Sequence, residues 1–157
     1  MNAIDFKTKS DFLDAMISRG FVHQCSDFEG LDAKAKAGGL TTYVGYDCTA
    51  PSLHVGSLIS IMMLSWLQET GNKPIALMGG GTTRVGDPSG KTETRKLLSI
   101  EKIRKNAEAL KKQLGRYIGF EQGRALLVNN ADWLSTLNYI EFLRDYGKHF
   151  SVNKMLA

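Results

Sequence analysis

Residues 40–57, LTTYVGYDCTAPSLHVGS, decide the fold of this chain. Their first part, LTTYVGY, is rich in β-branched and aromatic side chains, which predicts a strand over residues 40–46. A polar turn around Pro51 follows, and a strongly apolar run over residues 56–70, ended by Gly71, then predicts a helix. A strand that passes through a short loop into a helix is the first half of a βαβ unit.

Two further strands and one long helix complete the predicted sheet. The strands are PIALM at residues 74–78 and ALLV at residues 125–128. The helix between them is predicted by apolar residues that recur mostly three or four positions apart: Ile103, Ala107, Leu110, Leu114, Tyr117 and Ile118. Strands that alternate with helices and lack hairpin signals predict an α/β fold with an open, parallel, helix-covered sheet.

The carboxyl ends of these strands carry polar residues and glycines, namely Tyr46-Asp47, Gly79-Gly80-Gly81 and Asn129-Asn130. In open parallel sheets, ligands bind in the crevice beyond the carboxyl ends of the strands. The sequence therefore predicts a binding crevice where the three strand ends meet. Residues 82–90 are polar and punctuated by glycine, so we expect a loop there.

The remaining segments are predicted to form short helices. Ser10 is a suitable N-cap for a helix that ends near Gly20, and residues 31–37 predict a second helix. After the third strand, residues 139–146 predict another helix, and Ser151 is placed to cap a last one.

The composition is that of one soluble globular domain. The 157 residues are 43% hydrophobic and 23% charged. The longest near-apolar run, residues 58–67, is ten residues long, whereas a helix that spans a bilayer needs about 20. The acidic start of the chain does not fit a secretory signal, so we expect a cytoplasmic protein without a membrane span. Cys25 and Cys48 stand alone, and we expect neither a disulfide framework nor a metal site.

The positive charge of the chain is concentrated in one window. The net charge is +4, but residues 91–116 hold nine Lys or Arg and three Glu, a local charge of +6. Most of this window, from Lys102 to Lys112, is predicted to be the solvated face of the amphipathic helix. Its first two cations, Lys91 and Arg95, are four positions apart and would share one face of a helix.

The loop that follows the first strand contains the residue types of a phosphate site. Gly45 lets a ligand approach the strand backbone, and Thr49 and His54 supply donors beside a helix start, whose N–H groups and dipole favour anions. The alternative is that Thr49 is a turn residue and His54 a helix cap. For the His-x-Gly triplet alone, this alternative is the better interpretation.

The whole segment 43–57 favours the phosphate site over the turn and cap. It resembles the first signature of the class I aminoacyl-tRNA synthetases and, among them, of the bacterial tyrosyl-tRNA synthetases. That signature is Tyr-x-Gly-x-Asp-x-Thr-Ala-x-Ser-Leu-His-x-Gly-His. The matching residues here are Tyr43, Gly45, Asp47, Thr49, Ala50, Ser52, Leu53, His54 and Gly56. Further blocks match in order along nearly the entire chain, at residues 73–77, 86–91, 129–130, 132–133, 142–145 and 147–153.

The resemblance implies a Rossmann-like open parallel sheet with helices on both faces. It also implies ATP-dependent activation of L-tyrosine to tyrosyl-adenylate and transfer of the tyrosyl group to tRNA(Tyr). ATP would be a substrate, with Mg²⁺ carried mainly by its phosphates, because the sequence offers no carboxylate cluster to hold the ion. The family is homodimeric, so a homodimer is the expected assembly of the full-length protein.

Three residues are assigned to tyrosine by the same resemblance. Tyr43 would place its hydroxyl against the substrate phenol, and a buried hydrogen-bonding group left unpaired penalises phenylalanine strongly. Asp87 would receive the α-ammonium group of the substrate. Asn130, in the Asn-Asn block, would support the tyrosine pocket.

A second group of residues is assigned to ATP. Thr49 and His54 would hold the phosphates during the reaction, and Lys91 and Arg95 would close on the departing pyrophosphate. The implied ATP-binding positions are Gly45, Asp47, Thr49, His54, Gly56 and Ser57. Two positions depart from the family pattern, since Ser57 stands in place of the last signature histidine and Val44 in place of a frequent cysteine.

Bacterial tyrosyl-tRNA synthetases continue well past the length of this chain, into the rest of the tyrosine pocket, a Lys-Met-Ser-Lys-Ser loop and an anticodon-binding region. We therefore expect a helical segment at residues 1–39 and the first half of a catalytic domain at residues 40–157. Such a piece is expected to be inactive on its own.

Two other functions compete with this one. Gly90-Lys91-Thr92 after a strand is typical of a P-loop nucleotide hydrolase, but a P-loop needs a glycine where the chain has Val85, and Gly86 makes the loop one residue short. The other is a nonenzymatic RNA-binding or dimerisation module on the same fold, with the basic window as its footprint.

Overall fold

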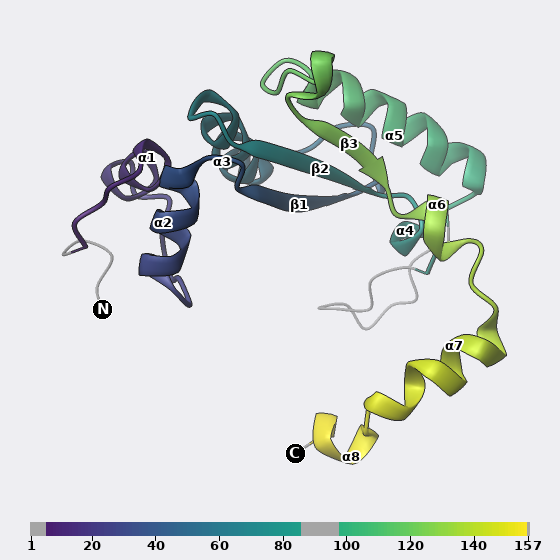
Figure 1. Cartoon of the computed structure of the whole chain (residues 1–157). Helices are drawn as coiled ribbons and strands as arrows, with labels where there is room; N and C mark the ends of the chain where they lie inside the picture. Colours follow the sequence, from purple (N-terminus) through teal and green to yellow (C-terminus); the bar gives the residue numbers. More distant parts are fainter. Residues whose placement is uncertain (1–5, 86–97, 157) are drawn as a thin grey trace.

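A three-stranded parallel sheet forms the centre of the computed structural model, which describes residues 6–85 and 98–156 (Figure 1). The strands are β1 (Thr41–Asp47), β2 (Lys73–Gly79) and β3 (Leu126–Asn129), hydrogen-bonded in the order β1-β2-β3. Asp47 is in register with Gly79, and Met78 with Asn129. The strands therefore end at the same edge, and the predicted open parallel α/β sheet is confirmed.

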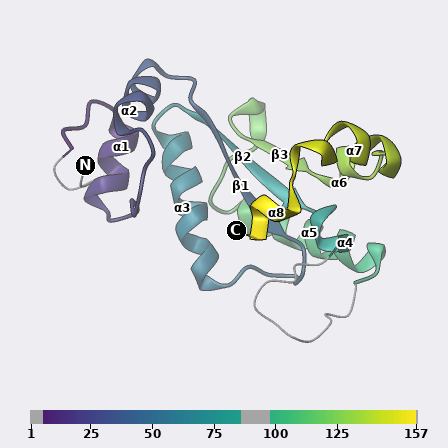
Figure 2. The ribbon, with the colours of Figure 1, turned by 90° about the horizontal axis from the view of Figure 1, so that it is seen from below.

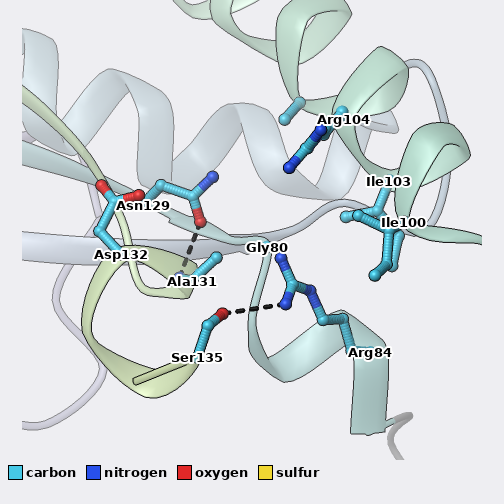
Figure 3. Close-up of a pocket in the computed structure, with 10 residues that line it drawn as sticks. Gly80, Arg84, Ile100, Ile103, Arg104, Asn129, Ala131, Asp132 and Ser135 are labelled. Carbon is cyan, nitrogen blue, oxygen red and sulfur yellow. Dashed lines mark hydrogen bonds between the residues drawn. The ribbon is translucent and has the colours of Figure 1, made fainter.

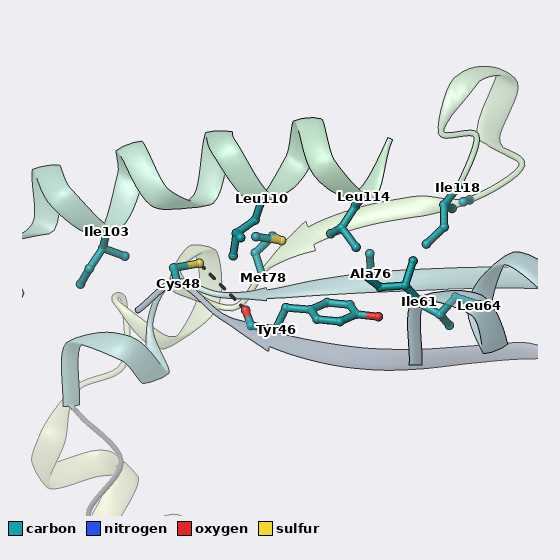
Figure 4. Packing of buried hydrophobic residues seen from close by; sticks show 11 residues of the cluster. Tyr46, Cys48, Ile61, Leu64, Ala76, Met78, Ile103, Leu110, Leu114 and Ile118 are labelled. Atoms are coloured by element: carbon teal, nitrogen blue, oxygen red, sulfur yellow. Dashed lines mark hydrogen bonds between the residues drawn. The ribbon is translucent and has the colours of Figure 1, made fainter. Parts of the chain in front are cut away.

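Two long helices, α3 (Val55–Glu69) and α5 (Ile100–Leu114), cover one face of this sheet. Figure 4 shows their packing: the cluster joins strand residues such as Tyr46 and Met78 to Leu64 of α3 and Leu110 of α5. Side chains alternate across a strand, so Tyr43 points to the opposite face, where 68% of its surface is exposed. Of the two helical layers predicted, one is present in the described residues.

The helices α1 (Asp11–Ser18) and α2 (Phe28–Ala37) pack on the C-terminal half of α3 and form a second apolar cluster there. Ser10 caps α1 as predicted, and its hydroxyl oxygen accepts a hydrogen bond from Leu13 N–H. The helix α2 begins three residues before the predicted start, because the Asp27 carboxylate caps it through Gly30 N–H. The buried Asp32 of α2 then accepts hydrogen bonds from the backbone and hydroxyl of Ser10, which ties the two helices together.

Two sequence-based boundaries were wrong. Thr82–Val85 forms a short helix, α4, in the segment predicted as a loop. The helix α5 ends at Leu114 with Gly115 as its cap, so Ile118 lies beyond it. Ile118 is nevertheless buried in the same core, which explains why the apolar periodicity continues past the helix end.

The C-terminal segment is a series of short helical turns that leave β3. They are α6 (Ala131–Leu134), α7 (Tyr139–Asp145), η3 (Gly147–His149) and α8 (Val152–Leu156). One further short turn, η2 (Glu121–Gly123), precedes β3. Figures 1 and 2 show α7 at the opposite end of the sheet from α1 and α2. Large apolar side chains of this segment are exposed: Tyr139, Ile140, Phe142, Leu143, Tyr146, Phe150, Val152, Met155 and Leu156. Among the described helices, none is long and apolar enough to cross a membrane.

Candidate active site

The polar residues at the three strand ends form one hydrogen-bonded network. The Thr82 hydroxyl donates to Asp47 Oδ1 at 3.0 Å, and Asn130 Nδ2 donates to Thr82 Oγ1 at 3.2 Å. Asn130 Oδ1 also accepts a hydrogen bond of 2.6 Å from Gly81 N–H. Residues that follow β1, β2 and β3 therefore meet where the sequence predicted a crevice. Thr82 is the member of this network that sequence reasoning missed, because nothing in its local pattern distinguishes it from a turn residue.

The three successive glycines at the end of β2 leave room for the polar side chains of the neighbouring strand ends. A Cβ atom on Gly79 would collide with the Asp47 carboxylate, and one on Gly80 would collide with the Asn129 amide. A Cβ atom on Gly81 would lie 3.0 Å from Asn130 Oδ1. Each glycine thus leaves the space that one polar side chain of a neighbouring strand end occupies.

The loop between β1 and α3 begins at Cys48, whose backbone is held on both sides. Its N–H donates to Thr83 Oγ1 at 2.9 Å, and its carbonyl oxygen accepts from Asn106 Nδ2 at 2.9 Å. Burial raises the pKa of the Cys48 thiol to about 11, and the Asp47 carboxylate acts in the same direction. The thiol is therefore protonated at neutral pH and suited to packing. Thr49, the next residue, is exposed.

His54 is the N-cap of α3, which is the alternative that the His-x-Gly triplet left open. Its Nδ1 accepts a hydrogen bond of 3.0 Å from Gly56 N–H. A neutral imidazole that accepts at Nδ1 carries its proton on Nε2. The exposed ring thus keeps one donor for a ligand beside the helix start. A Cβ atom on Gly56 would lie 2.8 Å from the His54 ring, so the cap requires glycine at this position.

The uncovered face of β1 carries Tyr43, Gly45 and Asp47, each two residues from the next. All three are exposed, and a Cβ atom on Gly45 would meet nothing within 4 Å. The packing of the described residues therefore does not require glycine at this point of the strand.

Ser57 lies in the first turn of α3. Three predicted site residues, Asp87, Lys91 and Arg95, lie outside the described residues.

A cavity of about 360 Å³ lies beside this network, between α4, α5 and α6 (Figure 3). Arg84 enters it from α4 and donates through Nη1 to Ser135 Oγ at 2.9 Å. Arg104 of α5 also lines the cavity and is exposed, as predicted for the solvated face of this helix. Asp132 of α6 is another lining residue. Within the described parts of the chain, no group of His, Cys, Asp or Glu could hold a metal ion.

Residues 35–157 match the model of the family described as tRNA synthetases class I (W and Y). The chain belongs to this family. The resemblance inferred from the signature residues is thereby confirmed, and the P-loop and nonenzymatic alternatives receive no support from the comparisons.

Curated members of the family with high identity are named tyrosine–tRNA ligase. The one from Methylocella silvestris is 61% identical over 155 residues, which is 98% of this chain and 37% of the relative. The one from Nitrobacter winogradskyi is 63% identical over 151 residues, covering 95% of this chain and 36% of the relative. The chain thus spans little more than a third of the length of these relatives.

Solved structures of the family share the fold. A C-terminally truncated mitochondrial tyrosyl-tRNA synthetase from Aspergillus nidulans superposes with a TM-score of 0.76 at 31% identity, over 96% of this chain and 45% of that chain. The corresponding protein from Coccidioides posadasii has a TM-score of 0.73 at 27% identity. The α/β sheet described above is therefore the class I synthetase sheet in part.

Proposed function

We propose that this chain is the nucleotide-binding and tyrosine-binding first part of a tyrosine–tRNA ligase. The observation that carries the proposal is the meeting of three strand ends, through Asp47, Thr82 and Asn130, beside a loop that presents Thr49 and the free Nε2 of His54. A parallel sheet binds ligands at this edge. The names of the relatives supply the substrate class, tyrosine and its tRNA.

ATP occupies the loop and the start of α3 in this proposal. Thr49 and His54 donate to its phosphates, where the helix start also favours negative charge. Gly45 and Asp47 of β1 contact the nucleotide, which also contacts the first turn of α3. The residues on that turn are Gly56 and Ser57.

Tyrosine occupies the uncovered face of the sheet. The exposed Tyr43 pairs its hydroxyl with the substrate phenol, and Asp87 receives the α-ammonium group. Asn130 acts indirectly, because its amide is already engaged with Gly81 and Thr82 and so shapes the floor of the pocket. A phenol contact of this kind separates tyrosine from phenylalanine, since the analogue leaves a polar group unpaired.

The reaction is an adenylyl transfer. The tyrosine carboxylate attacks the α-phosphorus of ATP, the bond to the bridging oxygen breaks, and pyrophosphate leaves with that electron pair. Lys91 and Arg95 neutralise the charge that develops on the pyrophosphate. Mg²⁺ would be carried by the ATP phosphates. In the second step a hydroxyl of tRNA(Tyr) attacks the carbonyl carbon of the adenylate, an ester bond forms, and AMP leaves with the electrons of the broken anhydride bond. The assembly is a cytoplasmic homodimer.

The test is tyrosine-dependent exchange of pyrophosphate into ATP. It uses this chain alone and a chimera in which the chain replaces the matching 155 residues of the Methylocella silvestris relative. We expect exchange by the chimera, its loss in the Lys91→Ala and Arg95→Ala variants, and none by the chain alone. A chimera that folds, binds tRNA and does not exchange would overturn the proposal.

A further inference from the structure

Two amide side chains of α5 hold the loop between β1 and α3 from behind. Leu53 N–H donates to Gln113 Oε1 at 2.9 Å, and Gln113 Nε2 donates back to the Leu53 carbonyl oxygen at 3.3 Å. Asn106 Nδ2 donates to the carbonyl oxygen of Cys48. The backbone at both ends of the loop is therefore hydrogen-bonded to side chains of one helix, α5.

The position of these amides on α5 fixes the distance between the two ends of the loop. Asn106 and Gln113 are seven residues apart, which is two helical turns and about 10 Å along the axis. They share a face with Ile103, Leu110 and Leu114, all of which are buried in the main core (Figure 4). The packing of these residues in the core sets the position of the two amides relative to the sheet.

The residues between the two contacts have little else to hold them. Thr49, Ala50, Pro51 and Ser52 are all exposed. His54, the cap of α3, directly follows Leu53. The backbone contacts at Cys48 and Leu53 therefore position the loop that carries Thr49 and leads into His54, whose ring is held in addition by the hydrogen bond from Gly56 N–H.

We propose that Gln113 and Asn106 are positioning residues for the ATP site, and this inference rests on the function proposed above. Asn106 is 1% exposed, and the hydrogen bonds of both side chains go to the loop backbone. They hold the loop in its binding conformation before ATP arrives. A loop that is already ordered does not have to be ordered by the ligand, which favours binding.

Gln113→Met is the decisive substitution, because methionine has nearly the same length and removes both hydrogen bonds to Leu53. Two such bonds contribute enough to binding that we expect KM for ATP to rise about tenfold, with KM for tyrosine unchanged. Gln113→Glu keeps an acceptor for Leu53 N–H but turns a carboxylate oxygen toward the Leu53 carbonyl oxygen, so we expect it to raise KM for ATP as well. Lys112→Met is the matched control, since Lys112 is adjacent and exposed.

The chimera described above carries these substitutions, and two measurements are made on each variant. Exchange kinetics give KM for ATP and for tyrosine, and hydrogen exchange reports the protection of the Leu53 amide. Faster exchange of that amide together with a selective rise in KM for ATP supports the role of Gln113. Equal changes in both KM values, or a more mobile Leu53 with normal ATP kinetics, would refute it. An unsubstituted chimera without activity would instead count against the proposed function.

Discussion

The side-chain oxygen of Asn130 at the end of β3 accepts a hydrogen bond of 2.6 Å from the backbone N–H of Gly81 beyond β2. The two residues are 49 positions apart in sequence, and Asn130 is 7% exposed. This contact joins the ends of two neighbouring strands at the edge of the sheet where the crevice was predicted.

Replacement of Asn130 by alanine should therefore destabilise the protein. The substitution leaves the buried Gly81 N–H without a partner, which costs about 1–3 kcal/mol of unfolding free energy. Urea denaturation measures this loss, and Asn153→Ala, on the exposed surface of α8, is the control. Equal stability of the two variants would show that the Asn130 contact contributes nothing.

Alanine substitution should have different effects at two glycines, Gly80 and Gly45. Gly80→Ala introduces a Cβ atom into the space of the Asn129 side chain, whereas the same change at Gly45 meets open space. We expect Gly80→Ala to lower the melting temperature by several degrees, since strain of about 1–3 kcal/mol must be accommodated. Gly45→Ala should fold normally and weaken ATP binding in the chimera. Thermal denaturation and ATP titration of both variants check this pair of outcomes.

The contact between α1 and α2 should depend on pH through Asp32. Burial raises the pKa of the Asp32 carboxyl, but the hydrogen bonds from the Ser10 hydroxyl and from the N–H groups of Ser10 and Lys9 outweigh it and leave the pKa below its ordinary value. A carboxyl with a lowered pKa in the folded state stabilises the protein above its unfolded-state pKa, and this contribution is lost as the pH falls through the folded-state value.

We therefore expect unfolding free energy to decline below about pH 4, the ordinary pKa of aspartate. Asp32→Asn should lower stability at pH 7 by about 1–3 kcal/mol and reduce this acid dependence. Denaturant melts from pH 7 down to pH 3 give both quantities. Asp14→Asn, at an exposed position of α1, serves as the comparison, and an identical pH profile for the two variants would contradict the role of Asp32.

The two thiols should differ in reactivity. Cys48 is fully buried with its pKa raised to about 11, while Cys25 is only half-buried. The thiolate is the reactive form, so a thiol reagent at pH 8 should modify one cysteine in the native protein and two after denaturation. Mass spectrometry of the labelled peptides identifies the site, and rapid native labelling of Cys48 would show that the β1–α3 loop opens readily.

Tyr43 should determine the choice between tyrosine and phenylalanine. In the chimera, Tyr43→Phe removes the hydroxyl that the proposed function pairs with the substrate phenol. We expect the preference for tyrosine over phenylalanine to fall by about tenfold or more, because one hydrogen bond in a polar pocket is lost. The ratio of kcat/KM for the two amino acids measures it. A variant that keeps the full preference for tyrosine would contradict the proposed contact between the Tyr43 hydroxyl and the substrate phenol.

Much of the architecture follows from local sequence patterns. The strands at β1 and β2 and the cap at Ser10 were predicted within one or two residues, because β-branched runs, glycine stops and capping side chains act over short distances. The meeting of the three strand ends at one edge also followed, since the strands of a parallel sheet run in the same direction. The helix α4 and the end of α5 were missed, because the core burial of Ile118 and the turn at Thr82 depend on segments that are remote in sequence.

The sequence by itself determined the family, through a signature whose residue types and spacing suit a loop that leads into a helix start, and it named Asp47, Thr49, His54 and Asn130 as site residues. The tertiary structure decided how these residues are held. The hydrogen bonds of Thr82 to Asp47, of Gly81 to Asn130 and of Leu53 to Gln113 join residues between 35 and 60 positions apart. Such contacts leave no periodic trace in a single sequence, because they arise only when the pairing of the three strands and the packing of α5 on the sheet bring the partners within reach.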